Sequence, residues 1–146
     1  MTDTTRTALA ALILRLALGT LFLAHAGLKF FVFTPEGAAG FFASLGLPGA
    51  LAYAVTAIEA IAGAALLLGI AVRTLSLVTL PILLGSIVLV HGPNGWLFSN
   101  DNGGWEFPAF WAAALVVQAL LGAGAYAVRL PLNTTSANSL AAGGSA

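Results

Sequence analysis

Four stretches of this chain are long and apolar enough to cross a lipid bilayer as helices. A bilayer core of about 30 Å needs about 20 mostly apolar residues in helical form. The stretches that come near this length run from about 8 to 31, 51 to 72, 75 to 91 and 108 to 128. We therefore predict an all-α fold, a polytopic membrane four-helix bundle.

The composition excludes several other classes of protein. Apolar residues make up 60% of the chain and charged residues only 7%, whereas about a quarter of the residues in a soluble domain are charged. Five basic and five acidic side chains cancel, so we expect no surface for nucleic acid. The chain has no cysteine, which excludes disulfides, thiolate metal sites and iron–sulfur clusters within it.

The segments outside the apolar stretches have their own signals. Thr34-Pro35-Glu36 provides an N-cap, a proline for the first turn and an acidic residue, and apolar side chains follow on one side. We expect a short interfacial helix there, after the first span. Residues 131–146 are mostly Thr, Ser, Asn, Ala and Gly, so we predict a disordered tail after a membrane domain of residues 1–130.

The arginines predict the orientation in the membrane. Arg6 precedes the first span, Arg73 joins the second to the third, and Arg129 follows the fourth, so all three lie on one side. The loops of the other side carry acidic residues, including Asp101 and Glu106. By the positive-inside rule, the arginines face the cytoplasm. We expect a multi-pass protein of a bacterial or archaeal cytoplasmic (inner) membrane, with both termini cytoplasmic.

One face of the first span is polar. Arg15, His25 and Lys29 share a stripe with Leu18 and Phe22, at spacings of three, four and seven residues. An ionised group at the bilayer centre costs about 2.5–3.5 kcal/mol by insertion scales, so such groups usually face the interior of a bundle. Because of its depth, we expect Arg15 to be a buried charge partner.

Five polar side chains are predicted to converge in the outer half of the bundle. At 1.5 Å per residue, His25 lies roughly 9 Å and Glu59 roughly 12 Å below the outer boundary. His91 ends the third span near that boundary, Glu106 precedes the fourth, and Lys29 lies at the edge of the first. Each span would then supply at least one member of a His/Lys/Glu cluster.

Most of these residues also have a simpler explanation. Lys29 could extend to the interface, His91 could bond a carbonyl at a helix end, and Glu106 could be stabilised by a helix dipole. Glu59 has no such explanation, because it lies well inside its span. It is either protonated or paired with Arg15, Lys29 or His25.

Taken together, the motifs resemble the DoxX family of small four-helix membrane proteins. They occur in the family's order between about residues 12 and 129: Arg15-Leu-Ala-Leu-Gly19, His25-Ala-Gly-Leu-Lys29, Phe41-Phe-Ala-Ser-Leu-Gly-Leu-Pro48, Glu59, Gly63-Ala-Ala-Leu-Leu-Leu-Gly69, Arg73, His91-Gly-Pro-Asn-Gly95, Gly104-Trp-Glu106 and Gly122-Ala-Gly124. The resemblance implies a membrane subunit linked to quinol oxidation, and relatives include the membrane part of a thiosulfate:quinone oxidoreductase. The missing cysteine puts thiosulfate chemistry in doubt.

We therefore favour an accessory subunit linked to quinone or respiratory-chain redox chemistry. If the protein is an enzyme, it is a subunit of a quinone-dependent oxidoreductase. His25, Lys29 and His91 could donate hydrogen bonds to a quinone, while Glu59 and Glu106 could pass protons. The electrons would come from a partner or a bound cofactor.

Other functions remain open at this point. His25, His91, Glu59 and Glu106 could bind a metal, although no His-x-x-His spacing supports this. The protein could instead be a non-catalytic anchor for a soluble redox enzyme, with charges that only lock the bundle. A fully paired Glu59 with no cavity beside it would favour the anchor. A transporter is the weakest alternative, and self-association of the chain is possible.

Overall fold

The computed structural model describes residues 1–128, and this part of the chain is helical, without strands. The elements in chain order are α1 (Asp3–Gly27), η1 (Leu28–Val32), α2 (Pro35–Ser44), α3 (Ala50–Leu68), α4 (Val72–Ser86), η2 (Ile87–His91), η3 (Gly92–Asn94) and α5 (Glu106–Leu121). The predicted all-α fold is confirmed. Arg129 and the predicted disordered tail lie outside the described residues.

Three helices are long and apolar enough to cross a membrane. They are the continuous helices Asp3–Val32, Ala50–Leu68 and Val72–Asn94, with 30, 19 and 23 residues. The fourth predicted span corresponds to α5, an apolar helix of 16 residues. It ends before the predicted residue 128 because Gly122 takes a φ of 81° that an α-helix does not allow. That α5 also crosses the membrane stays a prediction.

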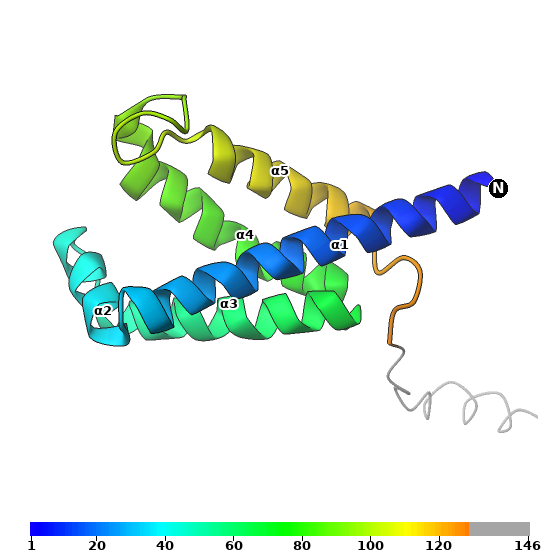
Figure 1. Ribbon diagram of the computed structural model, residues 1–146, viewed down its shortest axis with the longest axis horizontal. Helices are drawn as coiled ribbons and strands as arrows, with labels where there is room; N and C mark the ends of the chain where they lie inside the picture. Colours follow the sequence, from blue (N-terminus) through cyan, green and yellow to red (C-terminus); the bar gives the residue numbers. More distant parts are fainter. Residues whose placement is uncertain (129–146) are drawn as a thin grey trace, which may run out of the picture.

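The helices pack as two neighbouring pairs, α1 with α3 and α4 with α5, and α1 also contacts α5 (Figure 1). Two glycines allow α1 and α3 to approach closely. A Cβ atom added to Gly19 would lie 2.8 Å from the Gly63 carbonyl oxygen, and one added to Gly63 would lie 2.9 Å from that of Gly19. Small residues at crossing points are typical of helix packing in membranes.

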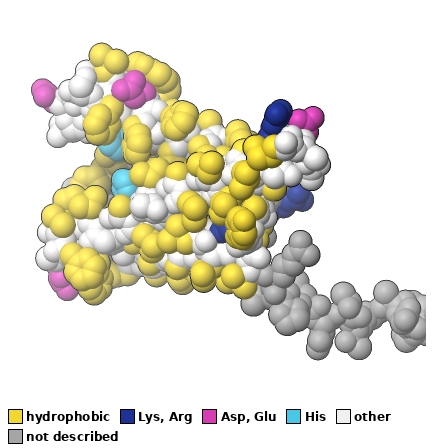
Figure 2. Space-filling view, turned by 45° about the vertical axis from the view of Figure 1, so that its right-hand side comes forward, with side chains coloured by type: hydrophobic (Ala, Val, Ile, Leu, Met, Phe, Trp, Pro, Cys, Tyr) yellow, Lys and Arg dark blue, Asp and Glu magenta, His cyan; other side chains and the backbone are white. Residues whose placement is uncertain are grey.

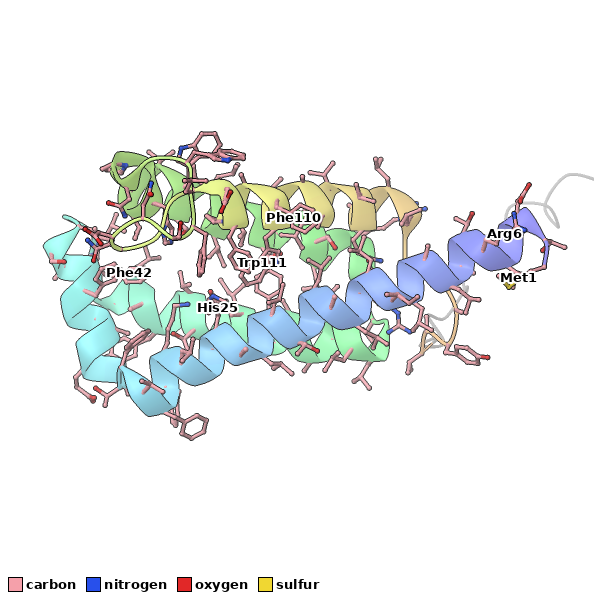
Figure 3. The ribbon with its side chains drawn as sticks, turned by 45° about the horizontal axis from the view of Figure 1, so that its top comes forward. Met1, Arg6, His25, Phe42, Phe110 and Trp111 are labelled. Atoms are coloured by element: carbon pink, nitrogen blue, oxygen red, sulfur yellow. The ribbon has the colours of Figure 1, made fainter. Side chains whose placement is uncertain are left out.

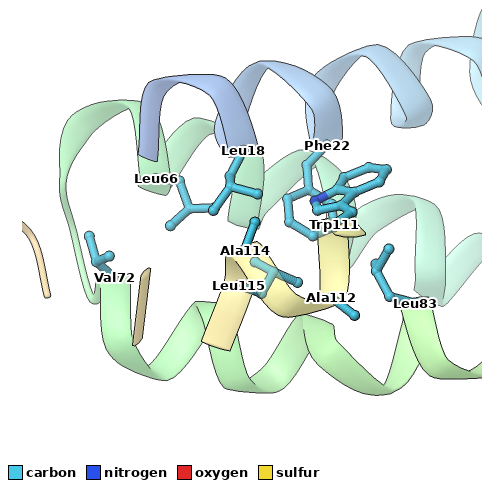
Figure 4. Close-up of a cluster of buried hydrophobic side chains, with 9 residues drawn as sticks. All are labelled: Leu18, Phe22, Leu66, Val72, Leu83, Trp111, Ala112, Ala114 and Leu115. Carbon is cyan, nitrogen blue, oxygen red and sulfur yellow. The ribbon is translucent and has the colours of Figure 1, made fainter. Parts of the chain in front are cut away.

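A cluster of buried hydrophobic side chains joins the two pairs (Figure 4). Its members come from four helices: Leu18, Phe22, Leu66, Val72, Leu83, Trp111, Ala112, Ala114 and Leu115. The outer surface is equally apolar, with Phe31 81% and Leu120 76% exposed. A soluble protein avoids such a surface, whereas a lipid-facing helix requires it.

The short helix predicted after the first span is present as α2. Its N-cap is Thr34, whose Oγ1 accepts a hydrogen bond from the Gly37 N–H at 3.2 Å, and Pro35 opens the first turn. Thr34 has a φ of 62°, so the chain reverses sharply between η1 and α2. In consequence α2 packs against η1 and α3 at one end of the molecule, which we call the α2 end.

The opposite end, which we call the N-terminal end, holds the start of α1 and the segment that follows α5 (Figure 1). The Ala125 N–H donates to the Ala8 carbonyl at 2.9 Å, and the Val128 N–H donates to the Leu68 carbonyl at 3.0 Å. Figure 2 shows the basic side chains of the visible face at this end. Arg6 and Arg73 therefore share one end of the molecule, and the side of the membrane that this end faces stays a prediction.

Candidate functional site

Lys29 and Glu59 form a buried ion pair between η1 and α3. Lys29 Nζ donates to Glu59 Oε1 at 2.9 Å and to Oε2 at 2.7 Å. The Glu59 side chain is 5% exposed and that of Lys29 is 19% exposed. Of the three partners considered for Glu59, the structure provides Lys29. Because both carboxylate oxygens are engaged, the pair neutralises a charge that lipid cannot solvate.

A π-helical turn positions Lys29. The segment η1 continues α1, and the Phe33 N–H donates to the Leu28 carbonyl five residues earlier, at 2.9 Å. A second π-helical segment, η2, ends at His91. Such turns account for well under 1% of residues in proteins and are frequent at functional sites. Both of them lie at the α2 end, and each carries a residue of the predicted cluster.

A cavity of about 480 Å³ lies beside the ion pair, between α1, η1, α2 and α3. Its wall is almost entirely apolar, and small residues create the space: Ala26, Gly27, Ala38, Ala52, Ala57 and Ala60. The polar groups on the wall are Lys29, Tyr53 and Thr56, and the Thr56 hydroxyl already donates to the Ala52 carbonyl at 2.8 Å. The volume lies within the range of small-molecule sites, about 300–1,000 Å³.

His25 lies on α1, four residues before Lys29 of η1, and its side chain is on the side of α1 that faces Trp111 (Figure 3). Its Nδ1 is 3.0 Å from the Leu21 carbonyl oxygen, and because a carbonyl oxygen only accepts, this nitrogen is the donor. The ring packs edge-on against Trp111 of α5, with centroids 4.9 Å apart. His25 therefore joins the two helix pairs.

His91 and Glu106 are engaged by the loop between η3 and α5. His91 Nδ1 lies 2.9 Å from the Gly103 carbonyl oxygen, while Glu106 Oε1 accepts from the Phe98 N–H at 2.7 Å. Both contacts are local, but they are not the ones we expected: His91 bonds a loop carbonyl rather than one at a helix end, and Glu106, in the first turn of α5, accepts from a loop N–H. Both histidines come to the surface in a hollow at the α2 end (Figure 2). Glu106 makes no ion pair within the described residues.

Arg15 is 1% exposed and belongs to the N-terminal end. Its Nη1 donates to the carbonyls of Leu66 and Leu67 at 2.9 and 2.6 Å, and its Nη2 donates to that of Ala125 at 2.9 Å. Its charge therefore faces the C-terminal carbonyls of α3, where the helix dipole is negative. Arg15 does not pair with Glu59.

The predicted cluster is thus only partly assembled. The structure joins Lys29 to Glu59, with His25 one turn away, whereas His91 and Glu106 contact the loop between η3 and α5. Within residues 1–128, no three His, Asp or Glu side chains come together to hold a metal ion. The metal alternative with His25, His91, Glu59 and Glu106 stays a prediction, and in the structure Glu59 contacts Lys29 while Glu106 contacts the loop backbone.

The comparisons with known proteins agree with this helical membrane architecture. The DoxX family model matches residues 10–92, more than half of the chain. This protein belongs to the DoxX family. The match covers α1 to η2, and so includes the ion pair and the cavity.

One curated relative is named "Putative oxidoreductase CatD", from Bacillus subtilis (strain 168). It is 37% identical over 82 residues, which make up 56% of this chain and 60% of the relative. The chain thus matches about 60% of the length of that relative. No solved structure matches the chain significantly.

Proposed function

We propose that this protein is a membrane subunit of a quinone-dependent oxidoreductase and that a quinone binds in the cavity beside Lys29 and Glu59. The observation that carries the proposal is an apolar cavity whose wall includes one half-buried, charged hydrogen-bond donor. Family membership and the name of the relative support a redox role. The cavity also favours a ligand site over an anchor, because a purely structural ion pair needs no space beside it.

The residues of the cavity fit the chemistry of a quinone. The ring and its prenyl tail are apolar, and the two carbonyl oxygens of the ring accept hydrogen bonds. Lys29 has three N–H donors, of which Glu59 takes two, so one is left for a ligand. The Tyr53 hydroxyl is a second donor on the wall. When bound, a quinone would supply the exchange of two electrons and two protons.

The ion pair can couple hydrogen bonding to proton transfer. A proton that reaches Glu59 removes the negative charge that holds Lys29. The lysine donors would then be free to turn toward the cavity. Lys29 would orient the ligand, and Glu59 would hold or release a proton at its carboxylate oxygens. The electrons would come from a partner subunit, since the chain has no cysteine or other redox side chain suited to this role.

The proposal includes the membrane topology. Arg6, Arg73 and Arg129 would face the cytoplasm and the α2 end would face outward, with α5 as the fourth span. At 1.5 Å per residue, α5 is about 24 Å long, which suits a thinned bilayer or a buried position in the bundle. The membrane would be the cytoplasmic (inner) membrane.

Equilibrium binding of short-chain quinones tests the proposal. The protein in lipid nanodiscs is titrated with ubiquinone-2 and with menaquinone-4. Ala60→Leu fills the cavity from α3, and Ala64→Leu adds the same volume at an exposed position one turn further along that helix, outside the cavity. We expect Ala60→Leu to weaken binding by about tenfold or more, equivalent to about 1.4 kcal/mol. Equal affinity of the two variants would contradict the proposal.

A further inference from the structure

Three buried polar atoms near the N-terminal end have no hydrogen-bond partner within residues 1–128. They are Arg15 Nε, Ser76 Oγ and Gln118 Oε1, from α1, α4 and α5. The three residues are at most 1% exposed. Inside a membrane protein, a polar group without a partner cannot form a hydrogen bond with bulk water instead. Each such group therefore destabilises the folded protein. A fourth such atom, Trp111 Nε1, lies two helical turns before Gln118 on α5.

The helix register brings Arg15 and Gln118 to one level. The helices α1 and α5 run in opposite directions (Figure 1), and the rings of Phe22 and Trp111 meet with centroids 4.8 Å apart. Arg15 lies seven residues before Phe22, and Gln118 lies seven residues after Trp111. Seven residues are two helical turns. Both side chains face the interior, and they are therefore opposite each other.

Ser76 lies at the same level on α4. A Cβ atom added to Gly122 would be 3.1 Å from Arg73 Nε, which aligns the start of α4 with the end of α5. Ser76 follows Arg73 by three residues, and Gln118 precedes Gly122 by four. Since α4 and α5 are neighbours that run in opposite directions (Figure 1), Ser76 and Gln118 lie at about the same level, and both side chains are fully buried.

The chemistry of the three atoms matches one water molecule. Arg15 Nε–H is a donor, and Ser76 Oγ can donate or accept. Gln118 Oε1 is an acceptor, because the amide Nε2 donates to the Gly122 carbonyl at 2.7 Å and so fixes the orientation of the side chain. A buried water typically makes about three hydrogen bonds and can meet both donors and acceptors. An anion would be repelled by the glutamine oxygen.

We propose that an ordered water molecule is bound between Arg15, Ser76 and Gln118. Through it, Arg15 links α4 and α5 to the carbonyls at the end of α3 that its Nη atoms already bind. Apolar side chains such as Leu18 and Leu115 separate this site from the ion pair at the α2 end (Figure 4). The inference is therefore independent of quinone binding.

Solution NMR of the full chain in nanodiscs, with ¹⁵N-labelled arginine, tests the inference. The Nε–H signal of Arg15 is assigned from its loss in Arg15→Lys. We expect a cross-peak between this proton and a slowly exchanging water. The cross-peak should be lost in Ser76→Ala and in Gln118→Leu.

Thr79→Val is the matched control, because its buried hydroxyl already donates to the Leu75 carbonyl at 2.8 Å. The water cross-peak should survive this substitution. Absence of the cross-peak in the parent protein would overturn the inference, and so would its persistence in Ser76→Ala. The serine variant deletes only one oxygen, so it keeps the test valid if Gln118→Leu does not fold.

Discussion

Lys29 and Glu59 carry opposite charges that neither lipid nor a packed core can solvate. Their contact at 2.7 Å makes the burial of each dependent on the other. Such a pair adds little stability compared with apolar residues of similar volume, whereas loss of one partner is costly. Stability alone therefore does not explain the pair, which is why we propose a role for it at the adjoining cavity.

At this scale we predict that Lys29→Met destabilises the protein strongly. The substitution leaves the Glu59 carboxylate buried without a partner, which should lower the free energy of unfolding by about 3–5 kcal/mol. Lys29→Met combined with Glu59→Leu removes both charges and should recover most of that loss. Denaturant unfolding in detergent micelles measures both effects. A double variant no more stable than Lys29→Met would show that the two charges do not depend on each other.

Within elements, the close contact of α1 and α3 determines the position of the ion pair. The contact depends on Gly19 and Gly63, whose missing side chains let the two backbones meet. This contact lies two to three helical turns before Lys29. If α1 moved away from α3 there, the distance between Lys29 and Glu59 and the shape of the cavity would also change.

We predict that Gly19→Ala weakens the fold even though alanine is the better helix former. Its Cβ would lie 2.8 Å from a backbone oxygen of α3, which has no room to give way. Gly85→Ala is the control, because nothing lies within 4 Å of its added Cβ, and it should leave stability unchanged or raise it slightly. Thermal unfolding measures the stability of the two variants, and Gly19→Ala should have the lower melting temperature. Equal melting temperatures would refute this account of the packing.

The sequence predicted the helices and part of the site, for physical reasons. Apolar length identified the spans, and the capping signal at Thr34 identified α2. The π-helical turns could not be foreseen, because one extra residue in a turn leaves apolar composition unchanged. The cavity was also missed, because an alanine such as Ala60 looks the same in a sequence whether it packs tightly or borders a space.

Across the whole molecule, charge and polarity divide between the two ends. The N-terminal end has the described arginines and the chain segment that follows α5, while the α2 end has the ion pair, the cavity and both π-helical turns. In a membrane, this division would place the candidate site near one surface, within reach of ligands dissolved in one leaflet.

The topology can be tested cleanly because the chain has no cysteine. We predict that Ser99→Cys, at the exposed loop of the α2 end, reacts with a membrane-impermeant maleimide in intact cells. Thr4→Cys, at the exposed start of α1, should react only after the cells are permeabilised. The opposite labelling pattern, or labelling of both cysteines from outside, would disprove the proposed orientation.

Native mass spectrometry of the protein released from its own membrane tests the central claim most directly. The account predicts an added mass that matches a menaquinone or a ubiquinone. This mass should be missing in Ala60→Leu, in which the cavity is filled, and present in Ala64→Leu. A bare chain, or one that carries only phospholipid, would contradict the claim, as would a quinone that both variants retain equally.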